Sequence, residues 1–260
     1  FDAYSAREGS LSHLSSLVLR PLLNYLRIWD RLAADRVNDF IAISRAVQLR
    51  IQKYYGRDSV ILYPPVDTEL FVPSGRPPGD YYLAGGRLIP YKRVDLAVRA
   101  FTKLGRPLLV YGEGRDLDSL RAIAGPTITF LGQVPWARLV QLFQDCRAFI
   151  FPGLEDFGIA PVEAQASGRP VIAYAGGGSL DTVVDGKTGV LFTESSVESL
   201  AAAVRRFETM TFAAEDIRRH AERFSVARFR HDLDAVINQK LDAHRAVLRT
   251  ATRPLPAAAP

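Results

Sequence analysis

Two glutamates separated by seven residues are the first candidates for chemistry in this sequence. Glu155 and Glu163 lie in GLEDFGIAPVEAQASG, which spans residues 153–168. Glu155 follows an apolar run typical of a buried strand, and Glu163 falls in the first turns of the helix expected next. Two carboxylates that open on one cleft could be the acid and nucleophile of a glycosidase, or acceptors for the hydroxyl groups of a polyol. Their spacing alone leaves both interpretations open.

A basic segment, GGRLIPYKR at residues 85–93, offers charges of the opposite sign. Its two glycines allow a tight turn, Arg87 provides a planar fork of donors, and Lys92 provides a point charge. This pair suits a diphosphate, and the alternative is a solvated basic loop. We favour the phosphate site because the segment follows a predicted strand. A diphosphate clamp has no use in the hydrolysis of neutral glycosides, so it favours the hydroxyl-acceptor interpretation of the glutamates.

Two glycine-containing motifs are less specific. YGEGRDLDSL, residues 111–120, resembles the start of a dinucleotide fingerprint but lacks the third glycine, and we interpret it as a tight strand-to-helix turn. AYAGGGSLDTVVDGKTG, residues 173–189, has three glycines between a predicted strand and a short helix. These glycines could form a cradle for an anion or a sugar hydroxyl, or a flexible loop.

No metal site is expected. The acidic pairs at 116/118 and 232/234 fall in predicted helices, where residues two apart point in different directions. None of the four histidines has the spacing of a metal ligand pair, and surface or packing roles are favoured; they are His13, His220, His231 and His244. The single cysteine, Cys146, is expected in the core.

These side chains require a parallel sheet to bring them together. From residue 80 onward, short apolar runs alternate with longer amphipathic ones, which predicts a doubly wound Rossmann-like α/β domain. Ligands of such sheets bind beyond the carboxyl ends of the strands. The expected strands span 81–85, 107–112, 127–132, 148–153, 170–175 and 189–192, and the expected helices span 94–103, 117–124, 135–145, 159–167, 179–184 and 196–207.

The chain before residue 80 follows another pattern. Leucines at three- and four-residue steps predict an amphipathic helix over 11–32, bent or restarted near Pro21. A strand at 40–44 and a helix to Tyr55 follow. We expect residues 1–66 to be the remnant of a second Rossmann-like domain, 67–79 a linker, 80–225 a complete domain, 226–249 a terminal helix that returns to the first domain, and 250–260 a disordered tail.

Composition narrows the function classes. The chain has 260 residues, 48% hydrophobic content and a formal net charge of +5. The charge suits anionic partners, but no basic block interleaved with aromatics indicates nucleic acid. No apolar run approaches the roughly 20 residues of a spanning helix, so a cytoplasmic protein is expected. The basic helix at 11–32 could lie on an anionic membrane surface or pack on a sheet, and packing is favoured.

Four motifs together resemble a known family. GRLIPYK, FLGQV, FPGLEDFGIAPVEAQASGRPVIAYAGGG and DTVVDGKTGVLF, in this order, are similar to the retaining glycosyltransferases of family 4, which have the two-domain GT-B fold. The similarity covers about residues 40–192. Within the family, the sequence most resembles bacterial mannosyltransferases that build O-antigen or exopolysaccharide. The resemblance implies one complete Rossmann-like domain that binds a nucleotide sugar, with GDP-mannose as the best guess, and no metal or other cofactor.

The resemblance also implies roles for particular residues. Glu163 would accept hydrogen bonds from the ribose, and Glu155 would contact the hydroxyls of the donor sugar. Arg87 and Lys92 would hold the diphosphate and stabilise its growing charge, with Glu155 completing the catalytic set. The remaining donor-binding residues would line the turn, the loop around sugar and phosphate, and the base site; they are Gly86, Asp156, Phe157, Gly158, Ile159, Gly132, Gln133 and Val134.

The resemblance further implies a glycan or lipid-linked acceptor and retention of donor stereochemistry; if the basic helix at 11–32 lay on a membrane, the protein would be peripheral at the cytoplasmic face of the inner membrane. Family members carry the acceptor site and a functional histidine in an amino-terminal domain. None of the four histidines here replaces that residue, so the sequence is expected to be an amino-terminally truncated fragment. Two alternatives stay open: a non-catalytic nucleotide-sugar-binding fragment, and a nucleotide-sugar epimerase.

Overall fold

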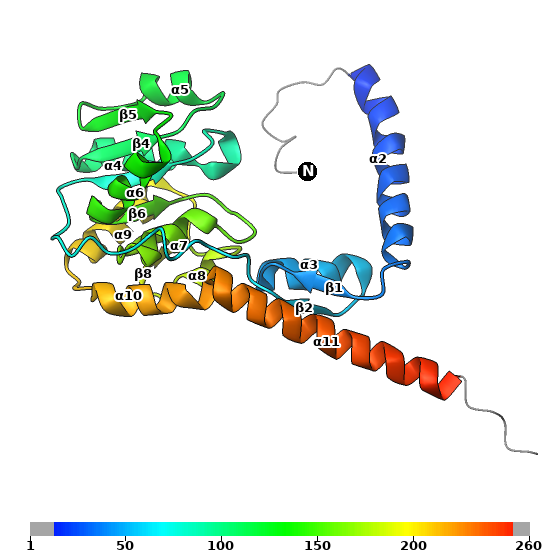
Figure 1. Cartoon of the computed structure of the whole chain (residues 1–260). Helices are drawn as coiled ribbons and strands as arrows, with labels where there is room; N and C mark the ends of the chain where they lie inside the picture. The colour runs from blue at the N-terminus through cyan, green and yellow to red at the C-terminus, as the bar shows by residue number, and fades with distance from the viewer. Residues whose placement is uncertain (1–12, 252–260) are drawn as a thin grey trace, which may run out of the picture.

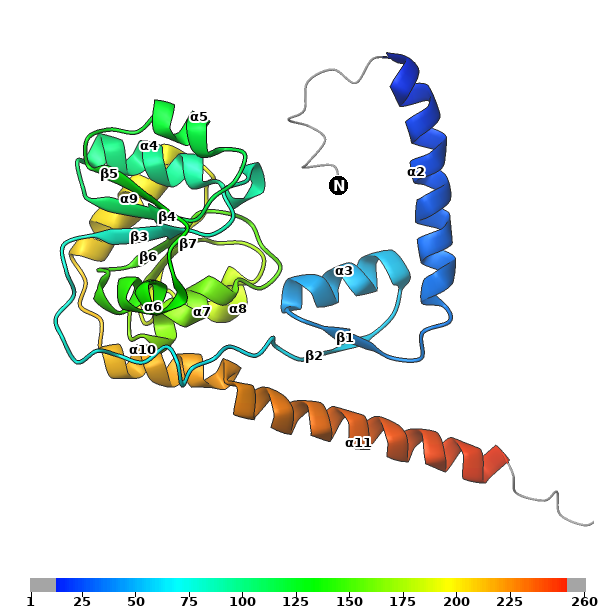
Figure 2. The ribbon, with the colours of Figure 1, turned by 45° about the horizontal axis from the view of Figure 1, so that its top comes forward.

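The computed structural model describes residues 13–251, with side chains described for 20–246. A six-stranded α/β domain lies beside a small two-stranded sheet, and two long helices extend from these parts (Figure 1). The first, α2 (His13–Ala34), stands away from the larger sheet. The second, α11 (Val226–Ala251), runs from the larger domain past the small sheet in both views (Figure 2). The expected tail beyond residue 251 lies outside the described residues.

The larger part, here called the sheet domain (residues 82–224), confirms the predicted doubly wound fold. All neighbouring strands are parallel, in the order β5-β4-β3-β6-β7-β8. The order reverses between β3 and β6, which places a ligand-binding crevice beyond their carboxyl ends. The strands are β3 (Tyr82–Gly85), β4 (Leu108–Tyr111), β5 (Ile128–Gly132), β6 (Phe149–Phe151), β7 (Val171–Tyr174) and β8 (Gly189–Phe192).

Helices cover both faces of this sheet. Successive strand residues point to opposite faces, so each strand contributes side chains to both buried layers. Tyr82 and Ala84 pack in one buried cluster, and Leu83 between them packs in the other. The first cluster contains side chains of α4 (Val94–Leu104), α5 (Leu117–Ala122) and α9 (Val197–Glu208). The second contains side chains of α6 (Trp136–Asp145), α7 (Ile159–Ala166) and α10 (Ala214–Ala221). Three short elements complete the domain: η1 (Pro90–Lys92), α8 (Ser179–Thr182) and η2 (Glu222–Phe224).

The small unit (residues 40–61) consists of β1 (Phe40–Ala42), α3 (Arg45–Tyr55) and β2 (Ser59–Ile61), with the two strands parallel. It is joined to the sheet domain through the chain and through α11. Val66 N donates to Phe224 O at 2.8 Å, and Lys240 Nζ lies 2.6 Å from Asp39 Oδ1. Lys240 of α11 therefore contacts the residue directly before β1.

Two helices add to the prediction. Helix α2 continues through Pro21, so of the two predicted possibilities, a bend or a restart, the restart is wrong. Proline removes one backbone donor but does not by itself end a helix whose flanking turns remain bonded. Helix α10 was missed, although Ile217 and Ala221 are buried at the four-residue spacing of a helix face. Its charged composition hides this short apolar stripe.

Candidate functional site

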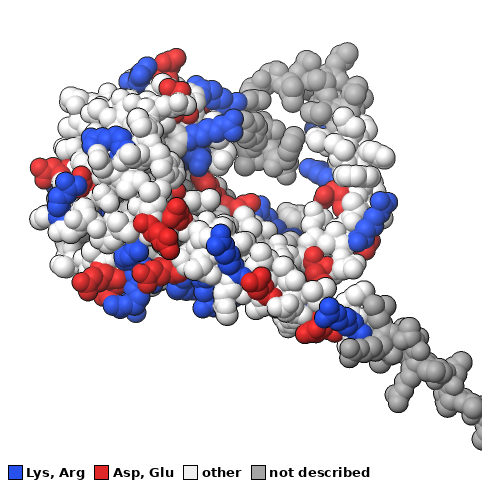
Figure 3. Space-filling view, viewed as in Figure 1, with Lys and Arg blue, Asp and Glu red and all other residues white. Residues whose placement is uncertain are grey.

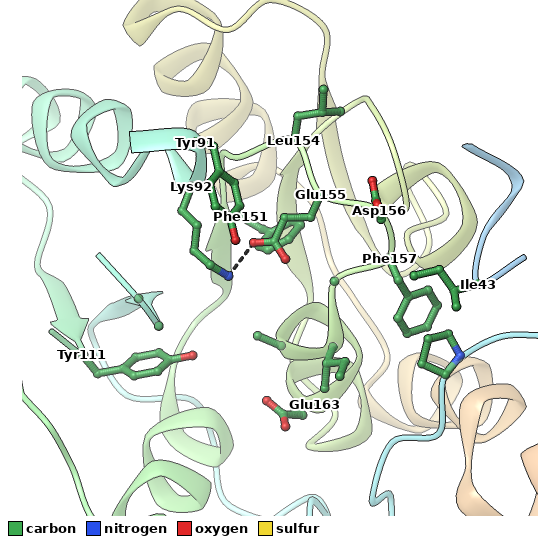
Figure 4. Close-up of a pocket in the computed structure, with 16 residues that line it drawn as sticks. Ile43, Tyr91, Lys92, Tyr111, Phe151, Leu154, Glu155, Asp156, Phe157 and Glu163 are labelled. Atoms are coloured by element: carbon green, nitrogen blue, oxygen red, sulfur yellow. Dashed lines mark hydrogen bonds and ion pairs between the residues drawn. The ribbon is translucent and has the colours of Figure 1, made fainter. Parts of the chain in front are cut away.

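The main cavity lies at the carboxyl ends of β3, β4 and β6, where the strand order reverses (Figure 4). Its volume is about 690 Å³, within the range of small-molecule sites. The sheet domain supplies most of its wall, and Ile43 and Pro64 come from the amino-terminal part of the chain. The other lining residues are Gly85, Gly86, Tyr91, Lys92, Tyr111, Phe151, Leu154, Glu155, Asp156, Phe157, Gly158, Ile159, Ala160 and Glu163.

Lys92 and Glu155 form an ion pair inside this cavity. Lys92 Nζ donates to Glu155 Oε1 at 2.5 Å, and the two side chains are only 22% and 18% exposed. The turn η1 ends at Lys92, and Arg93 follows in the left-handed conformation with φ 52°. This turn directs the Lys92 side chain toward the cavity, where partial burial reduces the screening of its charge.

Two glycines allow the loop that carries Glu155 to approach its neighbours. A Cβ atom on Gly153 would lie 2.8 Å from Lys92 Cα, and one on Gly177 would lie 2.0 Å from Glu155 O. Gly178 N also donates to Glu155 O at 2.8 Å. The glycines at 176–178 thus support the Glu155 loop from behind, a packing role that neither the anion-cradle nor the flexible-loop interpretation included.

Glu163 lies on α7 with its carboxylate toward the cavity (Figure 4). Burial raises its pKa to about 7, because a carboxylate removed from water loses hydration. Tyr111 is buried at the end of β4, and its hydroxyl points into the same cavity. Burial first, and then the negative charges of Glu163 and Glu155, raise the pKa of Tyr111. The cavity therefore presents a neutral phenol beside a carboxyl that titrates near neutral pH.

Sequence reasoning missed Tyr111 as a functional residue. The available signal was its position as the last large residue of a predicted strand, directly before a glycine. Among the predicted donor-binding residues, those at the strand turn, in the loop before α7 and on α7 line the cavity; they are Gly86, Lys92, Glu155, Asp156, Phe157, Gly158, Ile159 and Glu163.

The remaining predicted residues lie elsewhere. Arg87 is exposed and lines a neighbouring hollow with Ile89, Tyr91, Gly114 and Arg115. Tyr91 also lines the main cavity, so the two hollows adjoin. Residues 132–134, comprising Gly132, Gln133 and Val134, are outside the main cavity wall. The carboxylate of Asp156 is paired with Arg50 of α3.

Within residues 13–251, no group of three histidine, cysteine or acidic side chains is arranged to hold a metal ion. Cys146 is buried, and burial raises its pKa to about 12, as expected for a thiol in the core. His220 is partly buried, with Nε2 3.1 Å from Thr182 O, and burial lowers its pKa. Cys146 and His220 therefore have structural roles within the fold.

On the face shown in Figure 3, acidic and basic side chains interleave along the lower edge, and a group of basic ones lies where the sheet domain faces α2. Among the helices described, none is both long and apolar enough to cross a bilayer.

Comparison with known proteins places this geometry in a family. Residues 67–224 match the model of glycosyl transferases group 1. The chain belongs to this family. The α/β fold of the chain, with its six-stranded parallel sheet, matches GT-B glycosyltransferase structures.

Three proteins illustrate what the chain is similar to. D-inositol 3-phosphate glycosyltransferase of Mycobacterium marinum is 32% identical over 192 residues, 65% of this chain and 40% of that protein. GDP-mannose-dependent alpha-mannosyltransferase of Mycolicibacterium smegmatis is 31% identical over 194 residues, 74% of this chain and 49% of that protein. HepE of Anabaena, solved with UDP and glucose, has a TM-score of 0.72 at 22% identity and covers 82% of this chain and 66% of its own. The chain spans about half the length of the curated relatives it matches.

Proposed function

We propose that this glycosyltransferase moves a hexose, with mannose as the first candidate, from a nucleotide diphosphate sugar to a glycan or lipid-linked acceptor with retention. The observation that carries the proposal is the meeting of Lys92 and Glu155 at 2.5 Å in a cavity at the reversal of strand order, with Glu163 in the same cavity. A cation, two carboxyls and a helix start match the parts of a nucleotide sugar.

The diphosphate would lie against Lys92 and the amino-terminal end of α7. The start of a helix carries a partial positive charge and free N–H groups, and Gly158 and Ile159 at this start line the cavity. As the glycosidic bond breaks, negative charge grows on the leaving diphosphate. A fixed ammonium group in a partly shielded cavity stabilises that charge and lowers the barrier.

The carboxyls would bind hydroxyl groups. Glu155 would accept hydrogen bonds from the donor sugar, and its pairing with Lys92 keeps it next to the phosphate position. Glu163, deeper on α7, would accept hydrogen bonds from the ribose. Retention would follow from attack of the acceptor hydroxyl on the face of the sugar from which the diphosphate leaves.

The choice of GDP-mannose rests on two relatives whose names state dependence on it, at 29% and 31% identity. A non-catalytic nucleotide-sugar-binding module is the second candidate, since the same cavity could bind the donor without transfer. Binding of GDP-mannose and UDP-glucose by calorimetry tests both. If neither binds, both candidates fail. Binding with transfer to a glycan acceptor supports the transferase, binding without it supports the module, and donor turnover without acceptor supports an epimerase.

A further inference from the structure

Asp181 joins the sheet domain to the amino-terminal part of the chain through both of its carboxylate oxygens. Oδ2 accepts a hydrogen bond from the backbone N–H of Arg45 at 2.9 Å, and Oδ1 accepts one from the Tyr63 hydroxyl at 3.2 Å. Arg45 is the first residue of α3, where a carboxylate is also favoured by the helix dipole. One side chain of α8 thus binds two separate segments of the neighbouring part.

The same α8 is connected to the loop that carries Glu155. Gly178, which precedes α8, donates its N–H to Glu155 O at 2.8 Å, and Thr182 N donates to Gly178 O at 3.0 Å. A Cβ on Gly178 would lie 2.2 Å from Phe157 Cα, so the two backbones are in direct contact. A displacement of Asp181 would therefore be transmitted to the Glu155 loop.

Residues of the amino-terminal part also contact the Glu155–Phe157 loop directly. The Tyr63 ring packs on Phe157, with ring centroids 5.9 Å apart. Arg50 of α3 pairs with Asp156, but these side chains are 49% and 56% exposed, so this pair contributes less than the shielded contacts. In Figure 4 Ile43 lies beside Phe157, at the edge of the cavity.

We infer that Asp181 is a positioning residue of the donor site: it holds the start of α3 and Tyr63 against the Glu155–Phe157 loop, so that Ile43 and Pro64 form one wall of the cavity. Its consequence for ligand binding rests on the proposed function. The positioning itself does not, because it is a relationship between parts of the protein in the absence of ligand.

The ligand-free test is hydrogen exchange on the full chain. Asp181→Ala removes both acceptor oxygens, so neither the Arg45 N–H nor the Tyr63 hydroxyl keeps its partner on α8. Amides at 45–48 and at 155–158 should both exchange faster than in the wild type. The control is Asp185→Ala in the same motif, which removes the pair with Arg206. Faster exchange at 45–48 alone, or an equal change in the control, would overturn the inference.

The binding test compares GDP-mannose with GDP. Because Asp181 acts on the loop that carries Glu155, Asp181→Ala should weaken GDP-mannose binding by about tenfold and GDP binding by much less. Asp181→Glu, which keeps both oxygens, should recover part of the loss. Equal weakening of both ligands would indicate general damage and contradict the positioning role. If the wild type binds neither, the proposed function fails while the exchange result still decides the positioning.

A smaller change guards against a variant that does not fold. Tyr63→Phe removes only the hydroxyl that Asp181 accepts from, and leaves the ring on Phe157. It should reproduce the faster exchange at 155–158 to a lesser degree. Unchanged exchange in Tyr63→Phe together with normal exchange in a folded Asp181→Ala would reject the inference.

Discussion

Lys92 Nζ lies 2.5 Å from Glu155 Oε1, although the two residues are 63 positions apart in the sequence. Two backbones determine this distance. The turn after β3 carries Lys92, and the loop after β6 carries Glu155. Gly153 allows these two segments to approach closely, because a Cβ added at Gly153 would lie only 2.8 Å from Lys92 Cα. The pair therefore depends on the direct contact of two loops beyond adjacent strands.

Lys92→Ala should slow donor turnover by about 10²- to 10³-fold, because it removes the shielded cation proposed to stabilise the leaving diphosphate. Release of GDP from GDP-mannose measures the rate. The control is Lys103→Ala, which removes an exposed lysine paired with Glu198 on the outside of the domain. A rate within twofold of the wild type in Lys92→Ala would remove Lys92 from the mechanism.

Arg87→Ala should have a smaller effect than Lys92→Ala, about tenfold in the same assay. Its side chain is exposed and lines the adjoining hollow, where water and salt screen its charge more strongly. An effect equal to or larger than that of Lys92→Ala would mean that the diphosphate lies over the hollow of Arg87 and Arg115 instead.

Gly177→Ala should disturb the donor site, whereas Gly105→Ala should not. Both glycines have left-handed backbones, with φ of 59° and 64°, so both variants carry a strain of about 1 to 2 kcal/mol. Only at Gly177 does the new Cβ meet another group, Glu155 O at 2.0 Å; at Gly105 nothing lies within 4 Å. Calorimetry should show weaker GDP-mannose binding in Gly177→Ala alone. Matching affinities in the two variants would separate Gly177 from the site.

Glu163→Gln should become more stable relative to the wild type as pH rises. Burial raises the pKa of Glu163 to about 7 from 4.5, so the fold favours its protonated form. That preference contributes fully below the unfolded pKa and is lost as pH rises through the folded one. The variant, which cannot ionise, should gain about 2 to 3 kcal/mol of unfolding free energy between about pH 4.5 and 8.

Urea denaturation at several pH values measures this difference. Glu194→Gln, at an exposed position, controls for the loss of a surface charge. A constant difference between Glu163→Gln and wild type across the range would show that Glu163 is not shielded from water.

The local pattern of the sequence was sufficient for the sheet domain. Short apolar runs between amphipathic ones predicted all six strands to within two residues at each end, because burial on both faces of a parallel sheet leaves a strong signal. Gly189–Phe192 was predicted at its observed bounds. The charged helix α10 was missed because its buried stripe consists of few residues.

The rule that ligands bind beyond the carboxyl ends of parallel strands also predicts Lys92, Glu155 and Glu163 in one cleft. Side-chain types and their positions after predicted strands are sufficient for this prediction, since strand order determines which loops can meet.

Only the tertiary structure decided how these side chains pair. In the structure, Asp156 pairs with Arg50, Arg87 lines a neighbouring hollow, and Tyr111 lines the same cavity as Glu163. The structure also gives Asp181 two partners more than a hundred positions away. Such contacts depend on how segments far apart in the sequence pack together, and the local periodicity of the sequence does not predict this packing. The sequence by itself determined the elements and the chemistry available at the sheet edge, and packing between loops determined which groups face one another there.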